Sequence, residues 1–252
     1  MTSQALLRSA LVGCLLASAT PAWAQMGDDW NTPNTDDRVL PSSPQNAAFE
    51  LRIGKYLPEV DGGVEDGAFA QVFGNDDRYI IGFEVDWQFL RVGQFASLGA
   101  GFGLSYTKLG GSGIGETGEP TSEENTFSLY PMSLVGVLRV DFLARETPVP
   151  LVPYGKAGLG YAIWRVTDDR GVLHSEEGIV ASDVSYGTHL ALGLMFLLDP
   201  FDATAAVQID ENSGINNSYV FAEYTMRDLD GFDSSQMQVG DSSWIFGLAL
   251  EM

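Results

Sequence analysis

Side chains with catalytic potential are scarce in this sequence, and most of them lie in glycine-rich, acidic segments. His174, Ser175 and Glu176 are the residue types of a hydrolytic triad, and they follow one another directly. A triad requires three groups that separate parts of a fold hold in a fixed geometry, which neighbours on one flexible loop rarely achieve. We therefore predict a protein without enzymatic activity and keep a hydrolase as an alternative.

Acidic side chains offer two further kinds of chemistry. The adjacent aspartates at 76–77 and 168–169 are of the type that an acid-based protease uses, and the spacing of Asp228, Asp230 and Asp233 resembles part of a calcium-binding loop. That loop lacks the later glutamate that completes the coordination of calcium. We interpret these acids as residues that keep exposed loops solvated, predict no cofactor, and retain the calcium site as a hypothesis.

The N-terminus has the features of an export signal. Arg8 precedes an uncharged run of apolar and small residues over 9–19, and the small residues within 21–24 suit a signal peptidase. We predict a signal peptide over 1–24, followed by a flexible periplasmic leader over 25–46, which is polar and has no periodicity. A lipoprotein box that ends at Cys14 is the alternative interpretation of the same segment.

Composition limits the class of protein. Cys14 is the only cysteine, so disulfide bonds play no part after removal of the signal. The formal net charge is −21, which disfavours nucleic acid as a partner because both molecules would be anionic. About 228 of the 252 residues follow the predicted signal, which suits one barrel or sandwich domain. None of the later segments has the 18 consecutive apolar residues of a transmembrane helix.

The C-terminal segment 243–252 alternates regularly between large apolar residues and small or acidic ones, apart from one inward isoleucine. Such a period of two indicates a β-strand with one apolar face, which a soluble sandwich would bury and a membrane barrel would turn to lipid. The apolar positions are Trp244, Phe246, Leu248, Leu250 and Met252. An ending of this kind resembles the C-terminal insertion signal of bacterial outer-membrane β-barrels.

Seven further segments show the alternation of a strand. The clearest, 78–91, places six large apolar residues on one face and Glu84, Asp86 and Gln88 on the other. Strand 95–107 has only glycine and serine on its inward face, which leaves space for large polar side chains from neighbouring strands. The other predicted strands cover 47–57, 126–142, 151–166, 185–198 and 216–227.

The connections between the eight strands alternate in length. The long, acidic ones cover 58–77, 108–125, 167–184 and 228–242. A connection of intermediate length, 199–215, is expected to contain a short helix over 202–209. Outer-membrane barrels combine an even strand number with long outer loops and short periplasmic turns. We therefore predict an all-β fold, an eight-stranded antiparallel transmembrane up-and-down β-barrel over 47–252, located in the outer membrane.

Aromatic residues near both ends of the predicted strands fit the two interfacial girdles of a membrane barrel. The residues expected at the outer end are Tyr79, Tyr106, Tyr130, Tyr161 and Trp244. Those expected at the periplasmic end are Trp87, Phe89, Phe142 and Phe196.

The inward faces of the strands carry charged residues of both signs. An eight-stranded barrel has an interior just wide enough for side chains, and unpaired charges there are costly. We therefore predict a paired network that fills the lumen and makes the barrel rigid, with a narrow channel for small solutes or ions as the alternative. The network comprises Arg52, Glu84, Asp86, Arg139, Asp141, Lys156, Glu223, Arg227 and Glu251.

Three segments carry a resemblance to a family. LVPYGKAGLG at 151–160, GINNSY at 214–219 and FGLALE at 246–251 resemble an outer-membrane β-barrel family common in myxobacteria, and the architecture resembles the small OmpA-like and OmpX-like barrels. The resemblance implies a monomer in a Gram-negative outer membrane, in contact with membrane lipid, lipopolysaccharide and, during insertion, the barrel-assembly machinery. The resemblance implies location more than function, and our hypothesis for the function is a structural or interaction role in which acidic loops are displayed outside. A lipid A-modifying hydrolase is a further alternative, because some small barrels have that activity.

Overall fold

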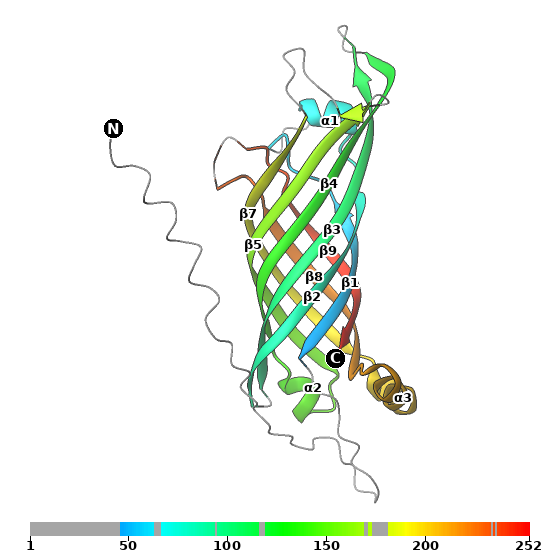
Figure 1. Cartoon of the computed structure of the whole chain (residues 1–252), viewed down its shortest axis with the longest axis vertical. Coiled ribbons are helices and arrows are strands. Elements are labelled where there is room, and N and C mark those ends of the chain that lie inside the picture. Colours follow the sequence, from blue (N-terminus) through cyan, green and yellow to red (C-terminus); the bar gives the residue numbers. More distant parts are fainter. Residues whose placement is uncertain are drawn as a thin grey trace, which may run out of the picture. The chain divides into compact units, whose positions relative to one another are not determined.

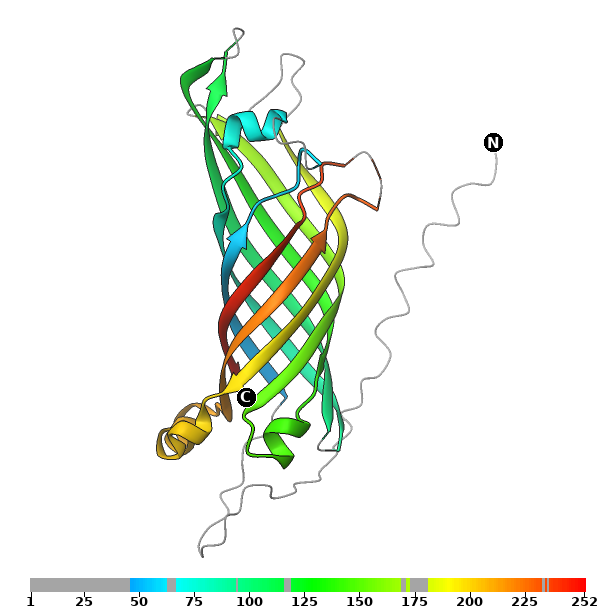
Figure 2. The same ribbon diagram turned by 180° about the vertical axis from the view of Figure 1, so that it is seen from behind.

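The protein folds into a barrel, which Figures 1 and 2 show from opposite sides. The computed structural model describes residues 46–62, 67–93, 95–115, 119–168, 171–172, 181–232, 234 and 236–252. In this part of the chain the wall strands are β1 (Ala47–Tyr56), β2 (Arg78–Val92), β3 (Ala96–Ile114), β4 (Pro120–Arg139), β5 (Leu151–Asp168), β7 (Ser182–Leu197), β8 (Asn217–Asp228) and β9 (Asp241–Glu251). The two-residue strand β6 (Gly171–Val172) only extends the outer end of β5 into a hairpin.

The wall is a single closed antiparallel sheet. Each wall strand pairs with its neighbours in chain order, and β4 pairs with β5 along 14 residue positions. The ring closes where β1 pairs with β9, from Ala48↔Glu251 to Gly54↔Ile245. The predicted eight-stranded antiparallel barrel is therefore confirmed. The predicted signal peptide and leader, 1–24 and 25–46, lie outside the described residues except for Asn46 and remain predictions.

Side chains alternate between the two faces of the wall, apart from an irregularity at Gln88–Leu90 in β2. Large apolar residues point outward and stay exposed, for example Leu51 at 59%, Leu134 at 61% and Leu192 at 67%. The charged residues between them point inward, and Glu50 and Glu84 are no more than 2% exposed. A soluble sandwich would bury its apolar face, so this arrangement contradicts that alternative and fits a wall that faces lipid.

Two strands extend beyond the predicted wall. We expected a loop over 108–125, but β3 and β4 continue as a paired hairpin there, from Lys108↔Ser128 to Ser112↔Glu124. Most of the segment has no apolar alternation because it projects past the lipid-facing belt, where backbone pairing joins the strands and Leu109 is the buried apolar residue. At the other end, β4 stops at Arg139, and the predicted strand residue Phe142 instead begins a short helix.

Four short helices lie at the two ends of the barrel. Helix α1 (Ala68–Phe73) lies at the end that carries the β3–β4 hairpin, and α2 (Phe142–Glu146), the 3₁₀ helix η1 (Asp199–Phe201) and α3 (Ala203–Ser213) belong to the opposite end, where β9 terminates (Figure 1). Helix α3 confirms the expected helix over 202–209 and continues further. The carboxylate of Asp202 caps it by accepting a hydrogen bond from the Ala205 N–H at 2.9 Å. None of the described helices is long and apolar enough to cross a membrane.

Aromatic side chains form exposed pairs near both ends of the strands, as a pair of interfacial girdles requires. At the outer end the ring centroids of Tyr106 and Tyr130 are 5.0 Å apart, and Tyr224 lies 5.4 Å from Trp244. At the periplasmic end Trp87 lies 6.0 Å from Phe89. These two levels mark the boundaries of the apolar belt.

Candidate functional site in the barrel lumen

Seven charged side chains meet near the middle of the lumen, and we refer to them as the charged layer. They project inward from β1, β2, β4, β5 and β8, and none is more than 5% exposed. Four are acidic and three are basic. The charged layer consists of Glu50, Arg52, Glu84, Asp86, Arg139, Lys156 and Glu223.

The sequence creates space for these long side chains on β3. A Cβ atom added at Gly101 would lie 3.1 Å from the Val135 side chain and 3.2 Å from a Glu84 oxygen, and it would also collide with Asp86. A Cβ at Gly103 would lie 2.6 Å from Ser133 and 3.1 Å from Glu84. The small inward residues of β3 are therefore needed beside the acids of β2, in agreement with the prediction for strand 95–107.

Lys156 and Arg52 each bridge several acids. The Lys156 ammonium lies 2.7 Å from a Glu50 oxygen, 2.5 Å from a Glu84 oxygen and 3.9 Å from a Glu223 oxygen. The Arg52 guanidinium donates to Glu50 at 3.1 Å and also to Glu84 and Glu223. Each of these carboxylates therefore has at least two cationic neighbours, which offsets the cost of burying its charge.

The remaining members complete the layer. Arg139 donates to Asp86 at 2.8 Å and to Glu50 at 3.5 Å. Two hydroxyl groups support Glu223, since the Tyr154 hydroxyl donates to it at 2.9 Å and the Thr225 hydroxyl donates at 3.0 Å. The layer is a cross-linked network that joins strands from around the barrel.

Three of the nine residues in the predicted network lie away from this layer. Glu251 accepts hydrogen bonds from Gln88 and Asn217, both at 2.8 Å, nearer the periplasmic end. Asp141 lies 3.6 Å from Arg145 beyond the end of β4, and burial raises the pKa of this carboxyl while Arg145 opposes the rise. The third, Arg227, stacks its guanidinium over the ring of Tyr56 at 5.6 Å.

The predicted network omitted two residues, namely Glu50, which belongs to the charged layer, and Tyr154, which donates a hydrogen bond to Glu223 of that layer. Both alternate with outward residues, and Glu50 lies two positions from Arg52, so the period-two pattern was sufficient to find them. His189 is 2% exposed and faces the lumen, where its Nε2 has no hydrogen-bond partner among the described residues.

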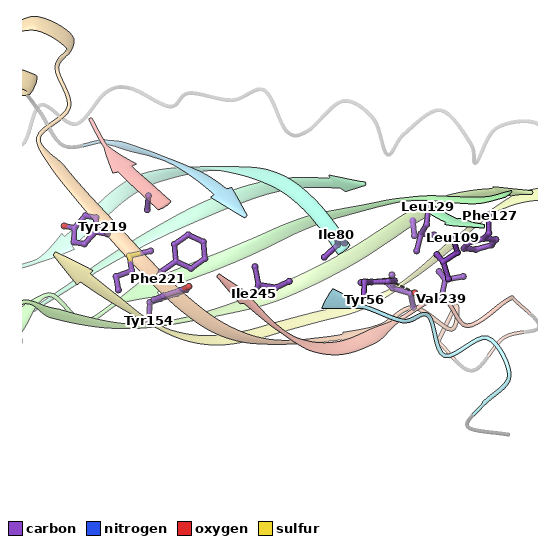
Figure 3. Close-up of a cluster of buried hydrophobic side chains, with 14 of the residues drawn as sticks. Tyr56, Ile80, Leu109, Phe127, Leu129, Tyr154, Tyr219, Phe221, Val239 and Ile245 are labelled. Carbon is purple, nitrogen blue, oxygen red and sulfur yellow. Dashed lines mark hydrogen bonds between the residues drawn. The ribbon is translucent and has the colours of Figure 1, made fainter. Parts of the chain in front are cut away.

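An apolar cap closes the lumen on the outer side of the charged layer. Figure 3 shows Tyr56, Leu109, Phe127, Leu129 and Val239 gathered at this end of the buried cluster. Helix α1 adds Phe69 and Phe73, whose ring centroids lie 5.2 Å and 5.8 Å from that of Phe127. This cap was not predicted, because the helix is only six residues long and lies within a glycine-rich, acidic segment.

Space between the cap and the charged layer is small. A cavity of about 10 Å³ is lined by residues that include Arg52, Glu84, Ser133, His189 and Arg227. This volume is about that occupied by the centre of one water molecule. Beside the charged layer, the described lumen therefore leaves room for about one water molecule.

The charged layer contains the acidic group best placed for a metal ion in the described part of the chain. Ligand oxygens of Glu50, Glu84 and Asp86 lie within 4.8 Å of one another. The Lys156 ammonium already lies within 2.7 Å of the first two, and Arg139 binds the third. Each of these acids therefore already binds a cation of the protein, although Asp86 Oδ1 has no hydrogen-bond partner among the described residues, and the arrangement suits structural cross-linking better than metal chemistry.

The other predicted site residues lie at the outer end or on the wall. Asp228 accepts a hydrogen bond from Gln238 at 2.9 Å, and Asp230 accepts one from the Phe232 N–H at 2.8 Å, while Asp233 lies outside the described residues. The calcium hypothesis for this loop therefore stays a prediction. The segment 174–176 also lies outside the described residues, so the hydrolase alternative is untested by the geometry.

The predicted insertion signal lies on the outer face of the last strand. Trp244, Phe246, Leu248 and Leu250 point toward lipid from β9 and are 36–56% exposed. Met252 follows β9, and its N–H donates to the carbonyl of the first strand residue, Ala47, at 2.8 Å. The terminal residues therefore contribute to barrel closure, and their role in recognition by the insertion machinery stays a prediction.

A closed eight-stranded barrel with an apolar outer belt, aromatic girdles and a filled polar lumen is an integral β-barrel protein of the bacterial outer membrane. No protein-family model matches the sequence, and no curated protein matches it significantly.

Similar solved structures are bacterial outer-membrane proteins. The attachment invasion locus protein Ail of Yersinia pestis is 13% identical over 84% of this chain and 99% of its own, with a TM-score of 0.41. OprG of Pseudomonas aeruginosa is 12% identical over 84% of this chain and 97% of its own, with a TM-score of 0.46. The protease OmpT of Escherichia coli is 9% identical over 82% of this chain and 94% of its own, with a TM-score of 0.35. A barrel fold alone does not decide whether a protein is an enzyme.

Proposed function

We propose that this protein is a non-conducting outer-membrane barrel that displays acidic loops for interaction at the cell surface. The observation that carries the proposal is the filled lumen, in which a charged layer lies beneath an apolar cap. The filled lumen then makes the barrel a rigid support, and the groups that contact molecules outside the cell belong to the loops.

The outer end has a strong charge bias that fits this role. The four predicted long connections there contain 19 acidic and two basic residues. Such a surface attracts cationic partners and repels other anions. We infer that the partners are basic segments of proteins or peptides, which the β3–β4 hairpin would meet first because it projects furthest from the wall (Figure 1).

Two measurements test the proposal. Purified barrel in planar lipid bilayers is expected to give no stepwise conductance, whereas reproducible steps would support the channel alternative. Cells that carry the barrel are expected to retain a fluorescent polylysine more strongly than cells that carry a variant with Glu119, Glu123 and Glu124 changed to glutamine. Equal retention by the two strains, at equal surface amounts of folded barrel, would contradict the interaction role.

A further inference from the structure

Pairing between β1 and β9 stops short of the outer ends of both strands. Pairing between these strands ends at Gly54↔Ile245, although β1 remains paired with β2 up to Tyr56 and β9 remains paired with β8 up to Asp241. The same register resumes outside the wall, where the Glu59 N–H donates to the Gly240 carbonyl at 3.0 Å. This open seam, 55–58 on one side and 241–244 on the other, makes no strand pairs between its two sides, although the Leu57 N–H donates to the Asp241 carboxylate.

A groove of about 470 Å³ lies over this open seam and faces the bilayer. Its volume is within the range of about 300–1,000 Å³ that is typical of ligand pockets. Apolar side chains that point outward line its lower part, and they are Ile53, Tyr79, Trp244 and Phe246, which are 47–72% exposed. Buried Tyr56 and Asp241 form part of its lining from the lumen side.

Polar residues of opposite charge lie at the edge of the groove. The Lys55 ammonium is 3.2 Å from an Asp77 carboxylate oxygen, and both side chains remain about half exposed or more. Ser242 adds an exposed hydroxyl group to the same lining. Because Trp244 and Tyr79 belong to the outer aromatic girdle, the groove is at the depth where lipid head groups meet acyl chains.

We propose that this groove binds one phospholipid whose head group contains both a phosphate and a primary ammonium. The acyl chain lies against the apolar lining, the phosphate accepts hydrogen bonds from Lys55 and Ser242, and the ammonium pairs with Asp77. A head group of net charge zero is favoured because the groove edge carries one charge of each sign and the protein as a whole carries −21. This site is separate from the lumen and does not depend on the function proposed for it.

Quenching of tryptophan fluorescence by brominated lipid tests the proposal, because Trp244 lies in the groove and Trp87 lies on the lipid-facing wall at the opposite end. The mature chain is prepared with Trp244 as its only tryptophan by changing Trp30, Trp87 and Trp164 to phenylalanine. A second form keeps Trp87 alone. Both are inserted into phosphatidylcholine vesicles that contain equal fractions of brominated phosphatidylethanolamine or brominated phosphatidylglycerol, and folding is verified by migration on an unboiled gel.

We expect the quenching of Trp244 fluorescence to show that phosphatidylethanolamine is enriched about threefold over phosphatidylglycerol at the groove. A threefold preference corresponds to the free energy of about one exposed ion pair. Trp87 should report none. Lys55→Gln and Asp77→Asn should each abolish the preference at Trp244, whereas Lys108→Gln should leave it unchanged. Equal quenching by the two lipids, a preference for phosphatidylglycerol, the same preference at Trp87, or a preference that survives both groove variants would each overturn the proposal.

Discussion

Replacement of Lys156 by methionine tests whether the charged layer stabilises the closed barrel. The Lys156 ammonium is fully buried and lies within 2.7 Å of both Glu50 and Glu84. Methionine preserves the apolar stem of the side chain but leaves these two carboxylates without that cation. Removal of one partner from a buried ion pair costs about 3–5 kcal/mol, because the other charge stays buried. We therefore expect the free energy of unfolding to fall by about 3–5 kcal/mol.

The measurement is a urea titration of the folded barrel in lipid vesicles, followed by tryptophan fluorescence and by the band shift of unboiled samples. Lys55→Met is the matched control, since its partner Asp77 is 47% exposed and an exposed pair contributes about 0–1 kcal/mol. Adding Glu50→Gln to Lys156→Met removes one of the abandoned charges, so it should recover about 0.5–3 kcal/mol. A loss for Lys156→Met within about 1 kcal/mol of the control would refute a stabilising charged layer.

Three further predictions concern the wall and the periplasmic end. Leu192→Arg places a charge on the lipid side of β7 and should cost about 2–4 kcal/mol in the same titration, whereas a loss near zero would mean that this face is in water. Gly158→Ala should prevent or slow insertion, as judged by the band shift, because a Cβ there collides with the Leu134 carbonyl, while Gly110→Ala, which has no atom within 4 Å, should insert normally. Burial raises the pKa of Asp199 above its ordinary 3.8, so ionisation weakens the fold as pH rises. Asp199→Asn should therefore be more stable than the native barrel at pH 7 and equal to it below about pH 4; lower stability at pH 7 would contradict this.

The wall of the barrel was predictable because lipid on one side and a narrow lumen on the other impose a period of two on each strand. That pattern is visible in 78–91 and 243–252, and it also identified six members of the charged layer. The orientation of the wall stays a prediction, which depends on the alternation of long and short connections along the chain.

Features outside the lipid-facing belt were not predictable in the same way. The hairpin over 108–125 is held largely by backbone hydrogen bonds, which any glycine-rich sequence can make, so apart from the buried Leu109 its residues carry no pattern. Helix α1 is stabilised by packing against Phe127 rather than by its own periodicity. Which inward charges meet depends on strand register, so the alternation placed Glu251 and Arg227 in the lumen without showing that they lie apart from the charged layer.

The charged layer also has a consequence for assembly. Arg52 and Glu223 are 171 residues apart in the chain, and Lys156 and Glu50 are 106 residues apart, so both pairs meet only after the sheet has curved far enough to bring β1 near β5 and β8. A half-formed sheet would carry several unsatisfied ions into hydrocarbon at high cost. Insertion therefore favours a single cooperative step in which ring closure and charge neutralisation coincide, and partly inserted intermediates should be short-lived.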